Sequence, residues 1–305
     1  MERKLNLKSM NSLKCSVFGV RYSVVGRIFL LFIVFCFYSF QTPNTKPQTT
    51  NLPVEQCLER QASFQLIKSI SIDAKDIQTD RIGNLYIITK SNQLYKYDSK
   101  GNLLGTLNYK YLGNINFIDA SNPFELYVFY KELNEILFLD NNLAYRGEIL
   151  LNDYGISQSS AIARSFDNGI WVFDNGDLQL KRMSKNGAAL QMSGNIKQFV
   201  NGNLQPNFIY DNNDQVFVND SNVGILVFNV FANFIKTIPI KHCNTIKIIE
   251  DDLFYNQSGK LMKYNLKTFT QSEFQLPDTT YIQQISIEKD RLFLLKPNSV
   301  DIYSY

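Results

Sequence analysis

The 305-residue sequence contains few of the residue types that most catalytic and metal-binding sites require. It has one histidine, His242, and four cysteines, none of which stand at a metal-ligand spacing. It also has no glycine-rich phosphate-binding motif and no Gly-x-Ser-x-Gly motif. The sequence therefore carries no visible apparatus for redox or phosphoryl-transfer chemistry, and we expect neither a cofactor nor a resident metal.

A basic excess is missing from most of the chain, although the formal net charge is +3. The first 40 residues hold six of the 31 basic and one of the 28 acidic residues, which leaves 25 basic and 27 acidic residues from position 41 onward. Proteins that bind nucleic acid usually carry a basic surface. We therefore expect no nucleic-acid partner.

The only long hydrophobic run covers residues 28–40, after a basic segment and before a polar stretch at 41–62. As a helix it would span about 20 Å, less than the hydrocarbon core of a bilayer, which favours a signal peptide. The long preceding segment and the lack of a small-x-small cleavage pair favour an uncleaved anchor. Either interpretation places the body of the protein outside the cytoplasm, in the periplasm or anchored to the inner membrane.

Two of the four cysteines, Cys57 and Cys243, fall in the predicted exported part. In an oxidising compartment they could form one disulfide that ties the N-terminal arm to the body. The alternative is two unpaired buried thiols, and the sequence leaves both open.

From position 63 the chain consists of short runs of β-branched and aromatic residues separated by Asn, Asp, Gly and Lys clusters, which predicts an all-β protein. One strand pattern recurs six times at spacings of 37 to 46 residues, around Leu85, Leu126, Ile170, Val216, Leu253 and Leu292. Six copies of this length predict a six-bladed β-propeller over residues 63–305.

The last copy of the repeat ends at Tyr305 without a fourth strand, whereas the segment 64–72 supplies a spare strand at the start. We therefore expect the N-terminal strand to complete the C-terminal blade and close the ring. We expect a monomer, because a closed ring leaves no sheet edge for a second copy. The predicted organisation is a leader at 1–40, a linker at 41–62 and a propeller at 63–305.

Two segments of the first copy carry a family resemblance. Asp80-Arg-Ile-Gly-Asn-Leu-Tyr86 and Tyr97-Asp-Ser-Lys-Gly-Asn-Leu103 resemble the repeat of six-bladed propellers of the TolB-like and NHL-like group. The resemblance covers about four fifths of the chain, and only the first copy matches closely. It implies a binding site at the mouth of the central channel.

Polar residues at the predicted innermost strands are the candidates for that site. They are Lys75, Asp76, Asn116, Asn207, Lys247 and Gln284. Related propeller lactonases hold calcium with carboxylate and amide oxygens, but two of the six candidates are lysines, which would oppose a cation. Trp171 and the acidic clusters 174–177, 211–214 and 250–252 are expected to be blade core and tight turns.

These observations favour a non-enzymatic, exported propeller that binds an envelope protein as an adaptor or assembly factor. A calcium-dependent hydrolase of the lactonase or esterase type is the first alternative, and its sign would be a carboxylate-lined channel. A carbohydrate- or peptide-binding propeller is the second, and it requires exposed aromatic residues around a pocket. His242 is expected to be an ordinary loop residue, because its neighbour Cys243 would point to the other side of an extended segment.

Overall fold

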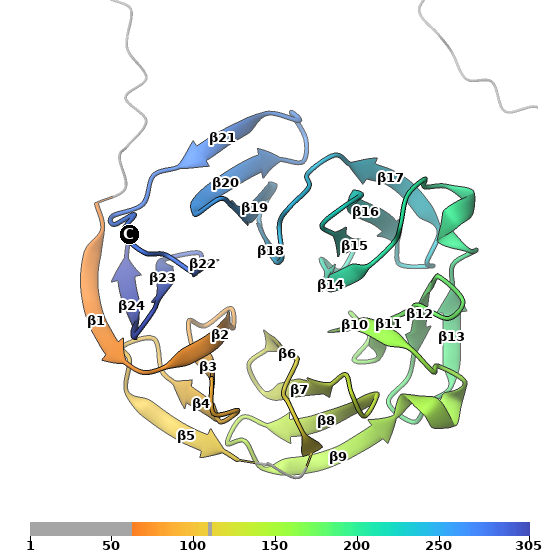
Figure 1. The fold of residues 1–305 in the computed structure, drawn as a ribbon, viewed down its shortest axis with the longest axis horizontal. Helices are drawn as coiled ribbons and strands as arrows, with labels where there is room; N and C mark the ends of the chain where they lie inside the picture. Colours follow the sequence, from red (N-terminus) through yellow and green to blue (C-terminus); the bar gives the residue numbers. More distant parts are fainter. Residues whose placement is uncertain (1–62, 109–111) are drawn as a thin grey trace, which may run out of the picture. The chain divides into compact units, whose positions relative to one another are not determined.

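The computed structural model describes residues 63–108 and 112–305, which form six antiparallel four-stranded sheets arranged around a central axis (Figure 1). Each sheet is one blade, so the prediction of a six-bladed β-propeller is confirmed. The predicted leader at 1–40 and linker at 41–62 lie outside the described residues. Within the described part of the chain, no helix has the length and apolar character needed to cross a membrane.

The strands of each blade follow the sequence from the channel outward. Blade 1 contains β2 (Ala74–Thr79), β3 (Leu85–Thr89), β4 (Leu94–Tyr97) and β5 (Leu103–Leu107), and blade 2 contains β6 (Phe117–Asn122), β7 (Glu125–Tyr130), β8 (Glu135–Asp140) and β9 (Tyr145–Leu150). Blade 3 contains β10 (Ser159–Arg164), β11 (Ile170–Asp174), β12 (Gln179–Met183) and β13 (Ala189–Met192), and blade 4 contains β14 (Pro206–Asp211), β15 (Gln215–Asp220), β16 (Gly224–Asn229) and β17 (Phe234–Ile238). Blade 5 contains β18 (Ile246–Ile249), β19 (Asp252–Gln257), β20 (Lys260–Asn265) and β21 (Gln271–Phe274). Single 3-10 turns, η2 (Leu151–Tyr154) and η3 (Ile196–Gln198), follow β9 and β13.

Blade 6 combines strands from both ends of the propeller. It contains β22 (Gln284–Glu288), β23 (Arg291–Lys296), β24 (Ser299–Ser304) and, on its outer edge, β1 (Gln65–Ser71). Strands β1 and β24 pair in antiparallel orientation: Ser69 Oγ donates a hydrogen bond of 2.5 Å to Asp301 Oδ1, and Ile70 lies opposite Val300. The edge of β24 is thereby paired with strand β1 of the same chain.

The tight turns explain the Asp and Asn clusters of the sequence. In blade 1, Asp80 Oδ1 accepts hydrogen bonds from the backbone N–H groups two and four residues later, and Asp98 does the same in the next turn but one. Gly83 and Gly101 complete these turns with φ values of +83° and +78°, which favour glycine. The clusters 174–177, 211–214 and 250–252 also lie at turns or bends, as predicted, with Asp174, Asp211 and Asp252 as the adjoining strand ends.

The hydrophobic core is divided among the interfaces between neighbouring blades. Trp171, which is fully buried, belongs to a cluster that joins blades 3 and 4, so its expected role in blade packing is confirmed. The interface between blades 1 and 2 is built in the same way, with Leu94 and Ile88 against Leu126 and Val128. Each blade is thus stabilised through its two neighbours.

The pairing of β1 with β24 generates a stability prediction. Ile70 is 8% exposed and packs in the cluster shared by blades 6 and 1, whereas Leu66 on the same strand is 52% exposed. Ile70→Ala should lower the free energy of unfolding in urea by about 2–5 kcal/mol. Leu66→Ala should change it by less than about 0.5 kcal/mol. Equal effects of the two variants would contradict an integral role for β1.

Candidate functional site

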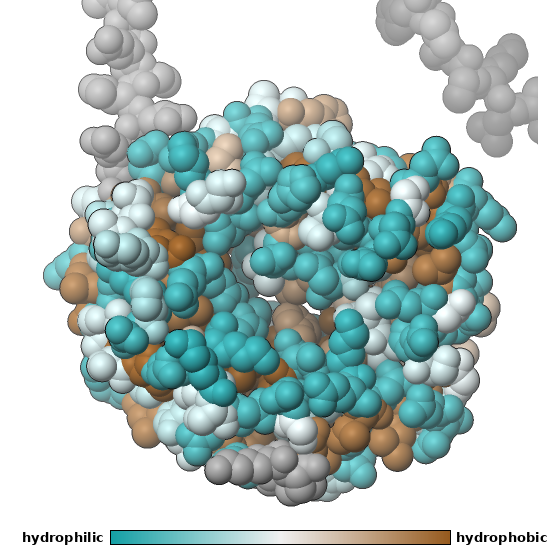
Figure 2. Space-filling view, in the orientation of Figure 1, coloured by the Kyte–Doolittle hydropathy of each residue, from teal (hydrophilic) through white to brown (hydrophobic). Residues whose placement is uncertain are grey.

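The central channel is lined by the innermost strands, including Gln78 of β2, Asp119 of β6, Tyr210 of β14, Lys247 of β18 and Ser286 of β22. Figure 2 shows one of its openings at the centre of the ring. At one mouth the channel widens into a hollow of about 510 Å³. This mouth is formed by the loops that follow the innermost strands, which we term the inner loops.

Each innermost strand has one edge that faces the channel without a neighbouring strand. Side chains from adjacent blades occupy several of these free backbone positions. Gln284 of blade 6 accepts a hydrogen bond of 3.0 Å from Ile77 N and donates one of 2.9 Å to Ile77 O in blade 1. Tyr210 Oη donates a bond of 3.2 Å to Ile248 O of blade 5. The polar side chains in the channel therefore have two roles: they bond to free backbone groups of the innermost strands, and they line the cavity.

The six predicted site residues are placed as follows. Gln284 also hydrogen-bonds the side chain of Asp76, and burial raises the pKa of that carboxyl above its usual range. Lys75 Nζ donates a long hydrogen bond of 3.4 Å to Ile115 O. Lys247 Nζ lies 2.5 Å from Glu288 Oε1; burial alone would lower the pKa of Lys247, but the Glu288 carboxylate raises it.

The two predicted asparagines are exposed and each bonds within its own blade region. Asn116 Oδ1 accepts a hydrogen bond of 2.7 Å from Lys131 N, and Asn207 Oδ1 accepts one of 2.8 Å from Asn219 Nδ2. Of the six residues, Asp76 and Gln284 are thus the two that the structure joins by a hydrogen bond, and Lys247 lines the hollow at the mouth. Ligand binding by the six residues stays a prediction.

Two carboxylates, Asp119 and Asp211, hold the inner loop of blade 3 from both sides. The sequence predicted Asp211 only as part of a tight turn and gave no indication of Asp119. Asp119 Oδ2 of blade 2 accepts a hydrogen bond of 2.6 Å from Arg164 N, and Asp211 Oδ2 of blade 4 accepts one of 2.9 Å from Phe166 N. Trp171 Nε1 also donates to Asp211 Oδ2, at 2.7 Å. These contacts fix the loop between its two neighbours.

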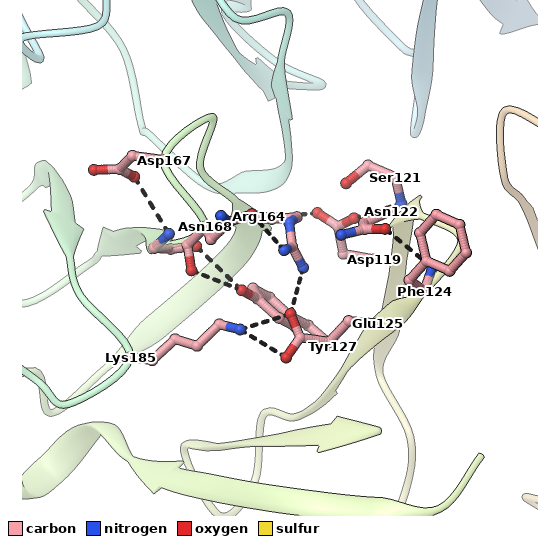
Figure 3. Close-up of polar contacts among 11 residues, drawn as sticks. Asp119, Ser121, Asn122, Phe124, Glu125, Tyr127, Arg164, Asp167, Asn168 and Lys185 are labelled. Atoms are coloured by element: carbon pink, nitrogen blue, oxygen red, sulfur yellow. Dashed lines mark hydrogen bonds and ion pairs between the residues drawn. The ribbon is translucent and has the colours of Figure 1, made fainter. Parts of the chain in front are cut away.

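An ionic network extends from this loop toward the rim (Figure 3). Glu125 Oε2 lies 2.6 Å from both Arg164 Nη1 and Lys185 Nζ. Burial alone would raise the pKa of Glu125, but these two cations hold it below its usual range. Both cations also lie over the ring of Tyr127, Arg164 at 5.2 Å and Lys185 at 5.6 Å from the centroid. The network joins blades 2 and 3.

Exposed apolar side chains frame this side of the mouth. Ile82, Phe124 and Phe166 lie on the inner loops of blades 1, 2 and 3 and are 60%, 68% and 45% exposed. The corresponding loops of blades 4 to 6 carry polar residues, namely 212–214, 250–251 and 289–290. We term the three apolar residues the apolar arc. The three residues do not occupy one repeat position, but each lies one to four residues before the second strand of its blade, so a comparison of these loops across the repeats is the signal that could have found the arc.

The cysteine and histidine predictions concern the loop before β18. Cys243 is buried, its thiol donates to Asn219 Oδ1 at 3.1 Å, and burial raises its pKa to about 11. Cys57 lies outside the described residues, so the disulfide stays a prediction. His242 is exposed on this loop, with a φ of +60°. Within residues 63–108 and 112–305, no group of three or more His, Cys, Asp or Glu side chains could hold a metal ion.

Comparison with known proteins supports the fold. The sequence matches no protein-family model and no curated protein. Among solved structures, streptogramin B lyase is 12% identical over 79% of this chain and 97% of its own, with a TM-score of 0.57. Virginiamycin B lyase from Staphylococcus aureus is 14% identical over 80% and 100%, with a TM-score of 0.55, and BamB from Moraxella catarrhalis is 11% identical over 80% and 98%, with a TM-score of 0.51.

At these identities the likeness establishes a shared fold. The chain is a six-bladed β-propeller, and its resemblance to the TolB-like and NHL-like group is confirmed at the level of architecture. An activity does not follow from this likeness, because one propeller fold serves many functions.

The ionic network yields a pH-dependent prediction. Glu125→Gln should lower the free energy of unfolding by about 1–3 kcal/mol near neutral pH, because two half-buried cations lose their carboxylate. Because the folded-state pKa of Glu125 is depressed, its contribution is present above the ordinary value of 4.5 and is lost as the pH falls through the folded value. The difference between wild type and variant should therefore shrink below pH 4.5 in urea titrations.

A matched control is the exposed pair of Lys260 and Glu273, whose charged atoms are 2.7 Å apart. Glu273→Gln should cost less than about 1 kcal/mol, because solvent screens the pair. A Glu125→Gln effect that is as small as this, or that does not change with pH, would contradict the interpretation of the network.

Proposed function

We propose that this protein is a non-enzymatic propeller of the bacterial cell envelope that holds a partner protein on the face bearing the inner loops. The observation that carries the proposal is the apolar arc of Ile82, Phe124 and Phe166 beside the polar channel mouth. Apolar anchors next to a polar, hydrogen-bonding rim are typical of surfaces that bind other proteins.

Rigidity supports this use of the face. The loop that carries Phe166 is held by Asp119 from one side and by Asp211 from the other. A loop whose backbone is held in one position before binding loses little conformational freedom when a partner arrives. Phe166 is therefore suited to act as an anchor.

The cellular location in this proposal rests on the sequence of residues 1–40. The basic segment followed by a thirteen-residue apolar run predicts export, as a cleaved signal or as an anchor. The propeller would then act outside the cytoplasm as a monomer. The intact mass of the purified chain distinguishes a cleaved leader from a retained one.

The solved lyases motivate an enzyme as the competing interpretation. One of them is described as a catalytically inactive histidine-to-alanine variant of virginiamycin B lyase from Staphylococcus aureus with quinupristin. The single histidine of the present chain, His242, is not among the residues that line the hollow at the channel mouth. We therefore base the proposal on binding rather than on a lyase reaction.

The experiment is affinity capture of the tagged, membrane-extracted protein in wild-type form and with Phe124→Ser and Phe166→Ser combined. We expect a stoichiometric partner protein with the wild type and at least a tenfold smaller yield with the double variant, because two anchors are worth about 2 kcal/mol or more. Quantitative mass spectrometry measures the ratio.

The matched control combines Leu133→Ser and Tyr281→Ser. These residues are 41% and 83% exposed and lie on loops at the opposite ends of the strands. This control should capture the partner as the wild type does. Capture that the arc variant retains and the control loses would overturn the assignment of the face.

A further inference from the structure

A groove of about 260 Å³ lies between blades 1 and 2, on the outer side of the apolar arc. It is lined by Ile82, Leu104, Gly105, Pro123, Phe124 and Leu143, together with Asn84, Lys96, Asn141 and Asn142. Leu104 is 56% exposed, and Ile82 and Phe124 are exposed to a similar degree, so the apolar side chains that line the groove face solvent. The groove has an apolar rim and a cationic group beneath it.

That group is the ammonium of Lys96, which is 4% exposed. Its Nζ donates a hydrogen bond of 2.6 Å to Asn141 O and lies 5.4 Å from the centre of the Tyr86 ring. No carboxylate of the described residues lies within 4.0 Å of this nitrogen. Burial lowers the pKa of Lys96, and the more distant Asp80 and Asp140 offset this effect only in part.

Equivalent positions in other blades show what Lys96 lacks. The register of the third strands places Arg182 of blade 3 and Lys263 of blade 5 at the position of Lys96, two residues before each turn. Arg182 pairs with Asp167 at 3.0 Å, and Lys263 pairs with Asp252 at 3.5 Å. In blade 1, the position of Asp167 is occupied by Ile82, three residues before the second strand.

We propose that the groove between blades 1 and 2 binds the C-terminal residue of a partner polypeptide. The terminal carboxylate pairs with Lys96, and the last side chain, an apolar one, packs against Ile82, Leu104 and Phe124. The ligand thus supplies the carboxylate that Asp167 supplies in blade 3. This inference rests on the proposed function, since it names the part of the partner that the face recognises.

Charge and hydrogen bonding select this occupant. Lys96 has three ammonium hydrogens and donates one of them to Asn141 O. It can therefore also donate to a carboxylate without losing its present partner. The side chains of Asn84 and Asn142 line the same groove and offer donors and acceptors to a peptide backbone. Asn84 Nδ2 already donates to Asp80 Oδ2 at 2.8 Å, so the groups that a purely apolar ligand would leave without a partner are the two remaining ammonium hydrogens of Lys96.

The test uses the full-length protein in detergent and a fluorescein-labelled peptide ending in Gly-Ser-Leu-Phe, as the free acid and as the C-terminal amide. We expect the acid to bind at least about tenfold more tightly than the amide in fluorescence anisotropy, because the amide cannot form the ion pair. Equal affinities, or no binding of either peptide, would overturn the proposal.

Two variants test the role of Lys96. Lys96→Met keeps the apolar stem and removes the ammonium, and it should abolish the preference for the acid. Ile82→Asp places a carboxylate where blade 3 has Asp167. This carboxylate should form an ion pair with Lys96 and lower the affinity for the acid peptide at least about tenfold. Lys263→Met, at the equivalent position of blade 5, is the control and should leave the preference unchanged. Thermal melts of all variants identify any that fail to fold.

Two further probes examine other carriers of a carboxylate. Tighter binding of decanoate than of the acid peptide would assign the groove to a fatty acid and overturn the peptide proposal. An amidated peptide with an internal Glu-Phe pair that binds as tightly as the free acid would overturn the terminal assignment. If the wild-type protein shows no preference for the acid peptide but still captures its partner through the apolar arc, this inference fails and the proposed function stands. If the acid peptide binds but capture of the partner does not depend on the arc, the proposed function fails.

Discussion

The free inner edge of each blade is the constraint on which the rest of this propeller depends. A four-stranded blade pairs its strands outward from the channel, so the backbone groups on one side of its first strand have no strand partner. Here the neighbouring blades supply partners: Gln284 for Ile77, Asp119 for Arg164 and Tyr210 for Ile248. The same bonds that satisfy these edges also hold the blades in register around the channel.

Most of the fold could be predicted because its signals are local. The alternation of apolar residues identifies the strands, and turns such as the one from Asp80 to Asn84 need a side chain that accepts two backbone hydrogens and a residue with positive φ. The same requirements recur in the turns that begin at Asp98, Asp140 and Asn229, and together with the recurring strand pattern their spacing indicates the number of blades. The hydrophobic segment before residue 41 is equally clear as a pattern, but its structure lies outside the described residues.

The candidate site was harder to predict, because it depends on contacts between blades. Gln284 was expected to face a ligand, and it bonds to both backbone groups of Ile77. Conversely, Glu125 looks like an ordinary strand residue in the sequence, and only the packing of blade 2 on blade 3 brings it to Arg164 and Lys185. Repeat alignment gives a partial remedy: comparing Ile82 with Asp167 identifies the position at which blade 1 departs from blade 3.

The composition of blade 6 has a consequence for the biosynthesis of the protein. Ser69 and Asp301 hydrogen-bond across a sequence separation of 232 residues, so this sheet cannot assemble until the last strand has left the ribosome. Contacts between such distant residues slow folding, and strand edges that are still unpaired during folding are prone to aggregate. A chain of this design completes its ring only after its last strand has been made, and its first five blades need protection until then.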